Sequence, residues 1–178
     1  VGFEEVKLLE KIDFFLKKYS IKAGIFSSVK KMTPEIRLKV LKKLPFVELN
    51  AETKVPFINL YETPRTLGVD RIALVANASL KFPKTNVLVI DAGTCITYDF
   101  INKKNEYLGG AISLGIEMRY KALHQLTSKL PLLEKNTFSA TIGKSTDESI
   151  HIGVKGGVVA EIEGVIAQYE KEKGHLTV

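Results

Sequence analysis

The sequence predicts an α/β protein, and three patterns support this. Helical and strand-like segments alternate through residues 4–49, three consecutive β-rich runs occupy residues 86–115, and a long helical segment starts near Ser145. Alternation of helix and strand is typical of a parallel α/β unit. Three strands in direct succession, with short turns between them, are typical of a β-meander. We therefore expect a parallel α/β unit followed by a meander.

The alternating unit lies in the first part of the chain. Apolar residues at helical spacing predict a helix over Glu4–Tyr19, and a short apolar run predicts a strand over Ala23–Val29. A Thr-Pro pair, typical of an N-cap and the first helical position, opens a helix expected over Thr33–Leu44. Pro45 ends that helix, and a second strand is expected over Phe46–Leu49.

The middle of the chain contains the meander. Pro56 and Pro64 interrupt regular structure, so an extended segment is expected there. A helix is expected from Asp70, through the sequence DRIALVANASL. The meander then begins with a buried apolar strand, Val87–Ile90, that runs directly into the sequence Asp-Ala-Gly-Thr.

Two helices are expected in the last third. The first spans Ile116–Leu130, up to a proline, and the second spans Ser145–Lys173, beyond a long polar connection over residues 132–144. Ser145 with Glu148 three residues later fits a capping box. Because glycine destabilises a helix interior by about 1 kcal/mol relative to alanine, repeated small residues indicate close packing against another helix or a subunit. These residues are Gly153, Gly156, Gly157, Ala160 and Gly164.

Composition narrows the classes of function. The net charge is +6, but the basic residues are spread along the chain without interleaved aromatic residues, so an anionic substrate is favoured over a nucleic acid. There is no apolar run of about 18 residues, as a membrane helix would need, and the N-terminus lacks a signal-peptide core. The lone cysteine, Cys95, suits a reducing cytoplasm and a role as a small buried apolar residue. A cytoplasmic protein without a membrane partner is therefore expected.

The turn after the first meander strand is the main candidate site. Gly93, which has no side chain, lets the backbone approach a ligand closely. The Thr94 hydroxyl can donate to a phosphate oxygen. Asp91 can hold a cation directly or through water. Structural roles remain open, since Asp91 could form the turn, Asp70 could cap its helix and Thr146 could cap the last helix.

Other phosphate-binding and catalytic patterns are missing from the sequence. The only Gly-Lys-Ser, at Gly143, lacks the upstream glycine of a Walker A loop, because that position is Phe138. There is no G-x-G-x-x-G and no G-x-S-x-G. The three histidines are far apart and none is paired with a cysteine, so zinc and a histidine-based triad are disfavoured. Phosphate chemistry through a different loop is the interpretation that remains.

Several motifs in order resemble the type III pantothenate kinase family. They are Tyr61–Arg71 (YETPRTLGVDR), Val89–Thr94 (VIDAGT), Tyr107–Ile112 (YLGGAI), Gly143–Thr146 (GKST) and Ile162–Gly164 (IEG). The resemblance implies an RNase H-like fold of the acetate and sugar kinase/Hsp70/actin superfamily, with two duplicated domains. Residues 1–70 would then be the remainder of the N-terminal domain, and residues 71–178 the second domain. The family's D-x-G-N-[ST] loop, which belongs to its first strand, has no counterpart here, and the family continues past the last helix into a further strand and a glycine-rich segment. We therefore expect a chain truncated at both ends.

The resemblance also implies roles for individual residues. Asp70 corresponds to the catalytic base, and Arg71 suits the pantothenate carboxylate. Thr94 corresponds to a contact with the ATP phosphates, and Asp91 to a ligand of a monovalent cation, K⁺ or NH₄⁺. Thr146 would contact substrate from the partner subunit of a homodimer. The pantothenate-binding residues so implied are Tyr61, Gly68, Val69, Asp70, Arg71 and Thr146.

The implied activity is ATP-dependent phosphorylation of pantothenate to 4'-phosphopantothenate, the first step of coenzyme A biosynthesis, with Mg²⁺ beside the ATP. Two alternatives remain open at this point. One is a non-catalytic regulatory relative with the same fold, and the other is a different small-molecule kinase of the superfamily. The intact Asp70, Arg71, Asp91 and Thr94 argue against the first alternative, and the Tyr61–Arg71 segment argues against the second.

Overall fold

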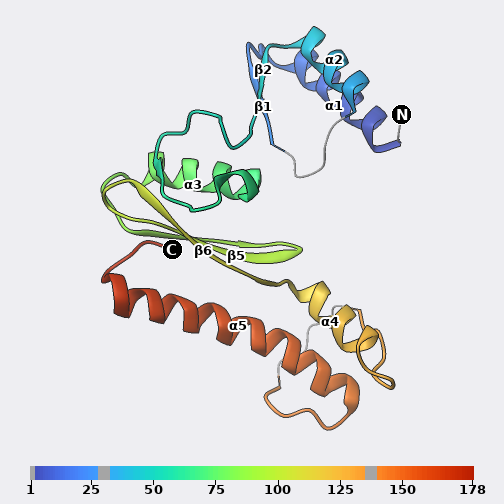
Figure 1. Ribbon diagram of the computed structural model, residues 1–178. Helices are drawn as coiled ribbons and strands as arrows, with labels where there is room; N and C mark the ends of the chain where they lie inside the picture. Colours follow the sequence, from blue (N-terminus) through green and yellow to red (C-terminus); the bar gives the residue numbers. More distant parts are fainter. Residues whose placement is uncertain (1–2, 28–32, 135–139) are drawn as a thin grey trace. The chain divides into compact units, whose positions relative to one another are not determined.

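The computed structural model describes residues 3–27, 33–134 and 140–178 (Figure 1). The chain forms two compact units. The first unit comprises Val1–Val55 and Thr63–Ala73, and the second comprises Pro56–Glu62 and Leu74–Val178. The mixed α/β class predicted from the sequence is confirmed.

The first unit contains the predicted parallel α/β arrangement. Its two strands pair in parallel, with Gly24 opposite Phe46. Proline opens the second helix as predicted, and Ile36 and Val40 on that helix are buried. The strand predicted over Ala23–Val29 is shorter than expected, and its positions 28 and 29 lie outside the described residues. The elements are α1 (Phe3–Lys18), β1 (Gly24–Phe26), α2 (Pro34–Lys43) and β2 (Phe46–Glu48).

Helix α3 (Val69–Lys81) follows a short 3₁₀ turn, η1 (Pro64–Thr66). It begins one residue earlier than predicted, so Asp70 lies inside the first helical turn. The alternative in which Asp70 is the residue that caps this helix is therefore wrong, because an N-cap residue precedes the first helical position. An acidic side chain in the first turn still interacts favourably with the helix dipole.

The second unit is built on a four-stranded sheet with the order β3-β6-β5-β4. The predicted meander is confirmed: β4 and β6 both pair antiparallel with β5. The first of these strands extends beyond Val87–Ile90, so Asp91 is a strand residue paired with Thr97 and does not form the turn. Strand β3, which the sequence did not indicate, pairs in parallel with β6. The strands are β3 (Ile58–Asn59), β4 (Val87–Ala92), β5 (Cys95–Ile101) and β6 (Glu106–Leu114).

Helix α4 (Ile116–Gln125) is shorter than predicted, because the expected helix reached Leu130. The Thr127 hydroxyl donates to the Leu123 carbonyl at 2.6 Å and so occupies an acceptor near the end of the helix. Nδ1 of His124 lies 2.8 Å from the Leu130 carbonyl oxygen, in a segment that has left the helix. Side-chain hydrogen bonds to the backbone thus replace the last predicted turn.

Helix α5 (Thr146–Lys173) starts as the capping box predicts. The Ser145 side chain accepts from the Glu148 backbone N–H at 3.3 Å, while a Glu148 oxygen accepts from the Lys144 N–H at 2.6 Å. Thr146 is the first helical residue, so the alternative that it caps α5 is wrong.

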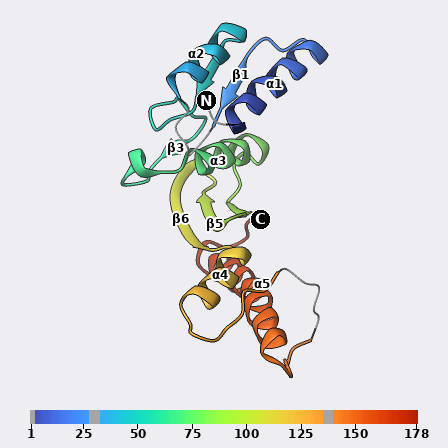
Figure 2. The same cartoon turned by 90° about the vertical axis from the view of Figure 1, so that its right-hand side faces the viewer.

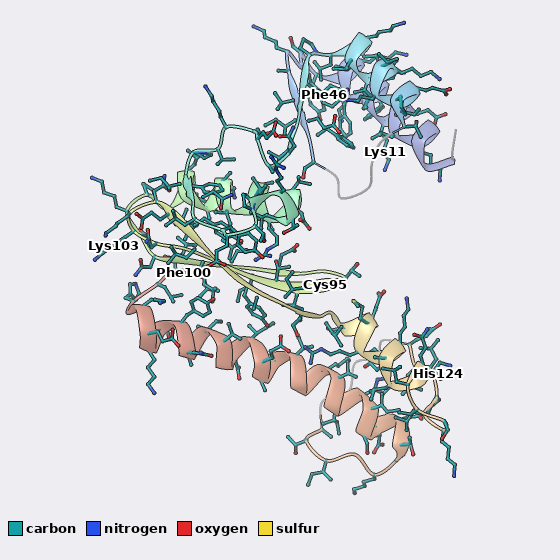
Figure 3. The ribbon with its side chains drawn as sticks, in the orientation of Figure 1. Lys11, Phe46, Cys95, Phe100, Lys103 and His124 are labelled. Atoms are coloured by element: carbon teal, nitrogen blue, oxygen red, sulfur yellow. The ribbon has the colours of Figure 1, made fainter. Side chains whose placement is uncertain are left out.

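Helix α5 runs along one face of the sheet in both views (Figures 1 and 2). Phe100 projects from β5 toward this helix, with its ring centroid 5.4 Å from that of Tyr169 (Figure 3). Burial of these apolar side chains is the main force that joins helix to sheet. The buried cluster comprises Leu88, Ile96, Tyr98, Phe100, Val158 and Leu176.

Three of the helix α5 glycines do not make the predicted close contact within this chain. A Cβ at Gly153, Gly156 or Gly164 would meet no atom of the described residues within 4 Å. Within the described part of the second unit these positions do not pack against another helix, and packing against a subunit stays a prediction.

Beyond helix α5, Thr177 forms a parallel bridge with Val87. Its carbonyl accepts from the Leu88 N–H at 2.9 Å, which adds an extended segment next to β4. None of the described helices combines the length and the apolar character needed to cross a lipid bilayer.

Candidate active site

The turn between β4 and β5, at Gly93 and Thr94, is held against the start of α4. The Gly115 N–H donates to the Thr94 carbonyl at 3.1 Å, and the Gly93 N–H donates to the Cys95 carbonyl at 2.9 Å. Cys95 lies at the end of the sheet near α4, opposite the turn that carries Lys103 (Figure 3). Its sulfur is 3.9 Å from that of Met118, as expected for a half-buried apolar residue rather than a reactive thiol.

Gly115 is required where it stands. A Cβ at this position would collide with the carbonyl oxygens of Gly93 and Thr94, which are backbone atoms and cannot rotate away. Any larger residue would push the turn away from the first turn of α4. The close approach of two backbone segments therefore fixes the backbone at Thr94.

A cavity of about 210 Å³ lies beside this turn. Its polar side chains are those of Thr94, which is exposed, and Glu117, in the first turn of α4. The Thr94 hydroxyl can donate to a phosphate oxygen in this cavity, whereas the Glu117 carboxylate has the same sign of charge as a phosphate. The lining residues are Ala92, Gly93, Thr94, Ile96, Ile116, Glu117 and Val158.

Asp91 is exposed at the end of β4, opposite Thr97 on β5. Residues directly opposite each other in an antiparallel pair project from the same face, so their side chains are neighbours. The Thr97 hydroxyl oxygen is buried and has no hydrogen-bond partner among the described residues. A carboxylate and a free hydroxyl oxygen fit a cation with loose coordination. Where the chain is described, no group of three or more His, Cys, Asp or Glu could hold a metal ion.

The start of α3 brings Gly68 and Asp70 together. Asp70 Oδ1 accepts from the Arg71 backbone N–H at 2.9 Å and lies over Gly68, where any Cβ would collide with it. Glycine at this position therefore leaves room for the Asp70 carboxylate, which is exposed and can accept a proton from a ligand. The Arg71 side chain, by contrast, is only 5% exposed. Val69, the first residue of the helix, is half-buried.

Tyr61 is oriented by the sheet. Its ring stacks on that of Tyr107, with centroids 6.0 Å apart and planes inclined by 22°. Gly109 has φ +107°, and a Cβ there would lie 3.2 Å from the Tyr61 ring. A glycine in β6 thus gives space to the tyrosine ring.

Thr146 lines a separate and larger cavity, of about 1050 Å³, between α4 and the first half of α5. Its walls are mostly apolar, and its polar rim includes residues 143–146 at the start of α5. His124 lies on α4 near this region (Figure 3). The structure thus places Thr94 and Thr146 in different cavities of the second unit. Gly68, Val69, Asp70 and Arg71 belong to the first unit, and Tyr61, Asp91, Thr94 and Thr146 to the second.

Several polar residues around the Thr94 turn were not indicated by the sequence motifs. Glu117 could have been noticed as an acidic residue in the first turn after a glycine. Thr97 follows the turn within an apolar strand, and its unpaired hydroxyl is visible only in three dimensions. Arg119 pairs with Glu161, 42 residues away, and no local pattern marks such a pair.

Comparison with solved structures found a protein with a similar fold. The chain is similar to the crystal structure of a protein described as a conserved putative Baf family transcriptional activator from Campylobacter jejuni. The TM-score is 0.56 at 27% sequence identity, over 86% of this chain and 68% of the other.

Sequence comparison then gives the family. The sequence model of the type III pantothenate kinase family matches residues 4–168. The type III pantothenate kinase of Flavobacterium johnsoniae is 46% identical over 168 residues, which is 94% of this chain and 69% of the relative. That of Bacteroides fragilis is 42% identical over 180 residues, covering 100% of this chain and 74% of the relative. The chain belongs to the type III pantothenate kinase family.

Proposed function

We propose that the chain transfers the γ-phosphoryl group of ATP to the primary hydroxyl of pantothenate, giving 4'-phosphopantothenate and ADP in the first step of coenzyme A biosynthesis. Identity of 46% to a type III pantothenate kinase over 94% of the chain is the observation that carries this proposal. The exposed Asp70 carboxylate over Gly68 supports it, because such a site needs a free base.

In this reaction the pantothenate hydroxyl oxygen forms a bond to the γ-phosphorus, and the bond from that phosphorus to the β,γ-bridging oxygen breaks. Asp70 orients the hydroxyl and accepts its proton, and ADP leaves with the bond electrons. Arg71 pairs with the pantothenate carboxylate, which fixes the distance to the reacting hydroxyl. The proposed pantothenate contacts are Tyr61, Gly68, Val69, Asp70, Arg71 and Thr146.

Thr94 is proposed to donate its hydroxyl to an ATP phosphate oxygen in the cavity of about 210 Å³. Asp91, with the unpaired Thr97 hydroxyl opposite it, is proposed to hold K⁺ or NH₄⁺. Mg²⁺, when bound with ATP, neutralises charge on the phosphate oxygens.

The domain assignment is also part of the proposal. Residues 1–70 would belong to one RNase H-like domain, and residues 71–178 to a second, duplicated one. The antiparallel meander followed by helices, with the parallel bridge from Thr177 to Val87, supports the second assignment.

A cytoplasmic homodimer is the proposed state. The open positions at Gly153, Gly156 and Gly164 support it, because such glycines are costly in a helix unless something approaches them closely. Sedimentation of the purified protein would measure its mass in solution, and a monomer at micromolar concentration would contradict the dimer.

Turnover of ATP by the full-length protein, measured with pantothenate and with a panel of other hydroxy acids, tests the activity. ADP formation that depends on pantothenate and on a monovalent cation is the expected result. Turnover with a different acceptor would indicate another small-molecule kinase. No turnover with any acceptor would favour a non-catalytic regulator, the second candidate, to which the name of the Campylobacter protein also points.

A further inference from the structure

A partly buried polar cluster joins the strands behind the Thr94 turn to both C-terminal helices. At its centre, Arg119 of α4 pairs with Glu161 of α5, and Glu161 also accepts from the Tyr98 hydroxyl at 2.8 Å. Their side chains are largely shielded from solvent, since Arg119 is 20% and Glu161 25% exposed. Tyr98, on β5, is 1% exposed.

The same arginine holds the end of β6. Arg119 Nε donates to the Leu114 carbonyl at 2.8 Å, and Nη2 donates to the Ser113 hydroxyl at 3.2 Å. Leu114 directly precedes Gly115, whose N–H donates to the Thr94 carbonyl at 3.1 Å. The residue that Arg119 contacts and the residue that holds the Thr94 turn are therefore neighbours in the chain.

The ionisation of the cluster is well defined. Burial alone raises the pKa of Glu161, but hydrogen bonds from Arg119, Tyr98 and Ser113 outweigh it and leave that pKa below its usual value. Burial, together with the hydrogen bond and charge of Glu161, raises the pKa of Tyr98 to about 12. Near neutral pH the cluster is thus an ionised Arg–Glu pair with a neutral tyrosine, and it keeps one hydrogen-bonding pattern.

From this geometry we infer that Arg119, anchored by Glu161 and Tyr98, is a positioning residue that holds the Thr94 turn in the conformation that binds the ATP phosphates. The inference rests on the proposed role of Thr94. Arg119 does not line the small cavity beside that turn, so it acts through Leu114 and Gly115 rather than by touching the nucleotide. If the turn is already ordered before ATP binds, binding loses less conformational entropy. Removing the Arg119 contact should therefore weaken the affinity for the nucleotide.

The test replaces Arg119 with glutamine in the full-length protein. The Kd of Mg-ATP, by calorimetry without pantothenate, should rise about tenfold in R119Q, and the KM for ATP should rise by a similar factor. The KM for pantothenate is compared in Tyr98→Phe, where it should stay within about twofold of the wild-type value, because Tyr98, unlike Arg119, does not line the cavity that contains Thr146. Arg119→Lys, which keeps a cationic donor near Leu114 and Glu161, should recover part of the ATP affinity.

Arg37→Gln is the matched control, because Arg37 also pairs with a glutamate, Glu48, at 2.7 Å. Neither of these two residues lines the cavity that contains Thr94. Arg37→Gln should leave the Kd for ATP unchanged. Tyr98→Phe removes only the hydroxyl that anchors Glu161, and should raise the Kd for ATP about threefold even if R119Q does not fold.

An unchanged Kd for ATP in folded R119Q and in Tyr98→Phe would overturn the inference. Equal increases in the KM values for ATP and pantothenate in Tyr98→Phe would also overturn it, since they would indicate a general loss of structure. Because the calorimetric measurement needs no turnover, it remains decisive if the protein does not phosphorylate pantothenate, whereas that result would contradict only the proposed function.

Discussion

The Tyr107 hydroxyl donates to the Asp99 carboxylate at 2.6 Å, and both side chains are fully buried between neighbouring strands. The Tyr107 ring also stacks against Tyr61, a proposed pantothenate contact. A buried carboxylate requires hydrogen-bond donors, and this one is satisfied in part by the residue that supports the ligand-facing ring. Stability and the proposed substrate contact therefore depend on one tyrosine.

Tyr107→Phe should lower the free energy of unfolding by about 1–3 kcal/mol, because it leaves a buried carboxyl oxygen without this donor. Urea unfolding measures the change. Tyr19→Phe removes a hydroxyl from a ring that is 51% exposed and should change the free energy of unfolding by less than about 0.5 kcal/mol. Equal effects of the two substitutions would show that the Asp99 contact contributes nothing.

Asp70→Asn should lower kcat/KM for pantothenate by at least about 100-fold, because the amide cannot accept the hydroxyl proton. The amide oxygen can still accept from the Arg71 N–H, so the fold should be retained. Glu35→Gln makes the same charge change in the first turn of another helix and should leave turnover unaffected. If pantothenate-dependent ATP consumption in the Asp70 variant stayed within a few-fold of wild type, the assignment of the base would be wrong.

Gly115→Ala should raise the KM for ATP at least about tenfold and destabilise the protein by about 1–3 kcal/mol, since the new Cβ meets two backbone carbonyls. Steady-state kinetics and urea unfolding measure the two effects. Gly164→Ala adds the same methyl group where no described atom lies within 4 Å, and should leave the KM for ATP unchanged. Normal ATP affinity in the Gly115 variant would refute the close-packed turn.

Asp91→Asn should raise the concentration of K⁺ or NH₄⁺ that half-activates turnover by about tenfold, because it removes the charge that attracts the cation. The activation curve is measured by varying the chloride salt at constant ionic strength. Glu170→Gln, an exposed position on α5, is the control and should leave the curve in place. An unshifted curve in the Asp91 variant would assign the cation site elsewhere.

Tyr98 should make stability depend on pH in alkaline solution. Its pKa is about 12 in the folded protein and 10.0 when unperturbed, so the unfolded chain loses the proton first. The stabilisation is fully present below pH 10 and is lost between pH 10 and 12, at about 1.4 kcal/mol per pH unit. Unfolding curves of wild type and Tyr98→Phe should differ in this slope, and parallel pH profiles would contradict the assignment.

The elements that the sequence predicted correctly are those specified by local rules. A proline at the first position opens α2, and the Ser145 capping box opens α5. The meander was recognisable because its apolar runs are separated by short turns rich in glycine and asparagine. The candidate turn at Gly93 and Thr94 was found from the same local signals.

The two-residue strand β3, by contrast, has too few residues for a periodic signal, and it exists because β6 offers a parallel edge. Helix α4 ends early because side-chain hydrogen bonds replace its last turn. Asp91 belongs to a strand because the ladder to Thr97 continues past Ile90. In each case a contact distant in sequence or a side-chain bond overrides local propensity.

The sequence by itself thus determined the α/β class, the order of most elements and the family motifs around Asp70, Asp91 and Thr94. Only the tertiary structure decided that Asp70 is exposed while Arg71 is buried, and that Arg119 donates to the Leu114 carbonyl. The physical reason is that burial and long-range hydrogen bonds depend on which segments meet after folding. Residue type and local spacing do not specify these contacts between segments that are distant in sequence.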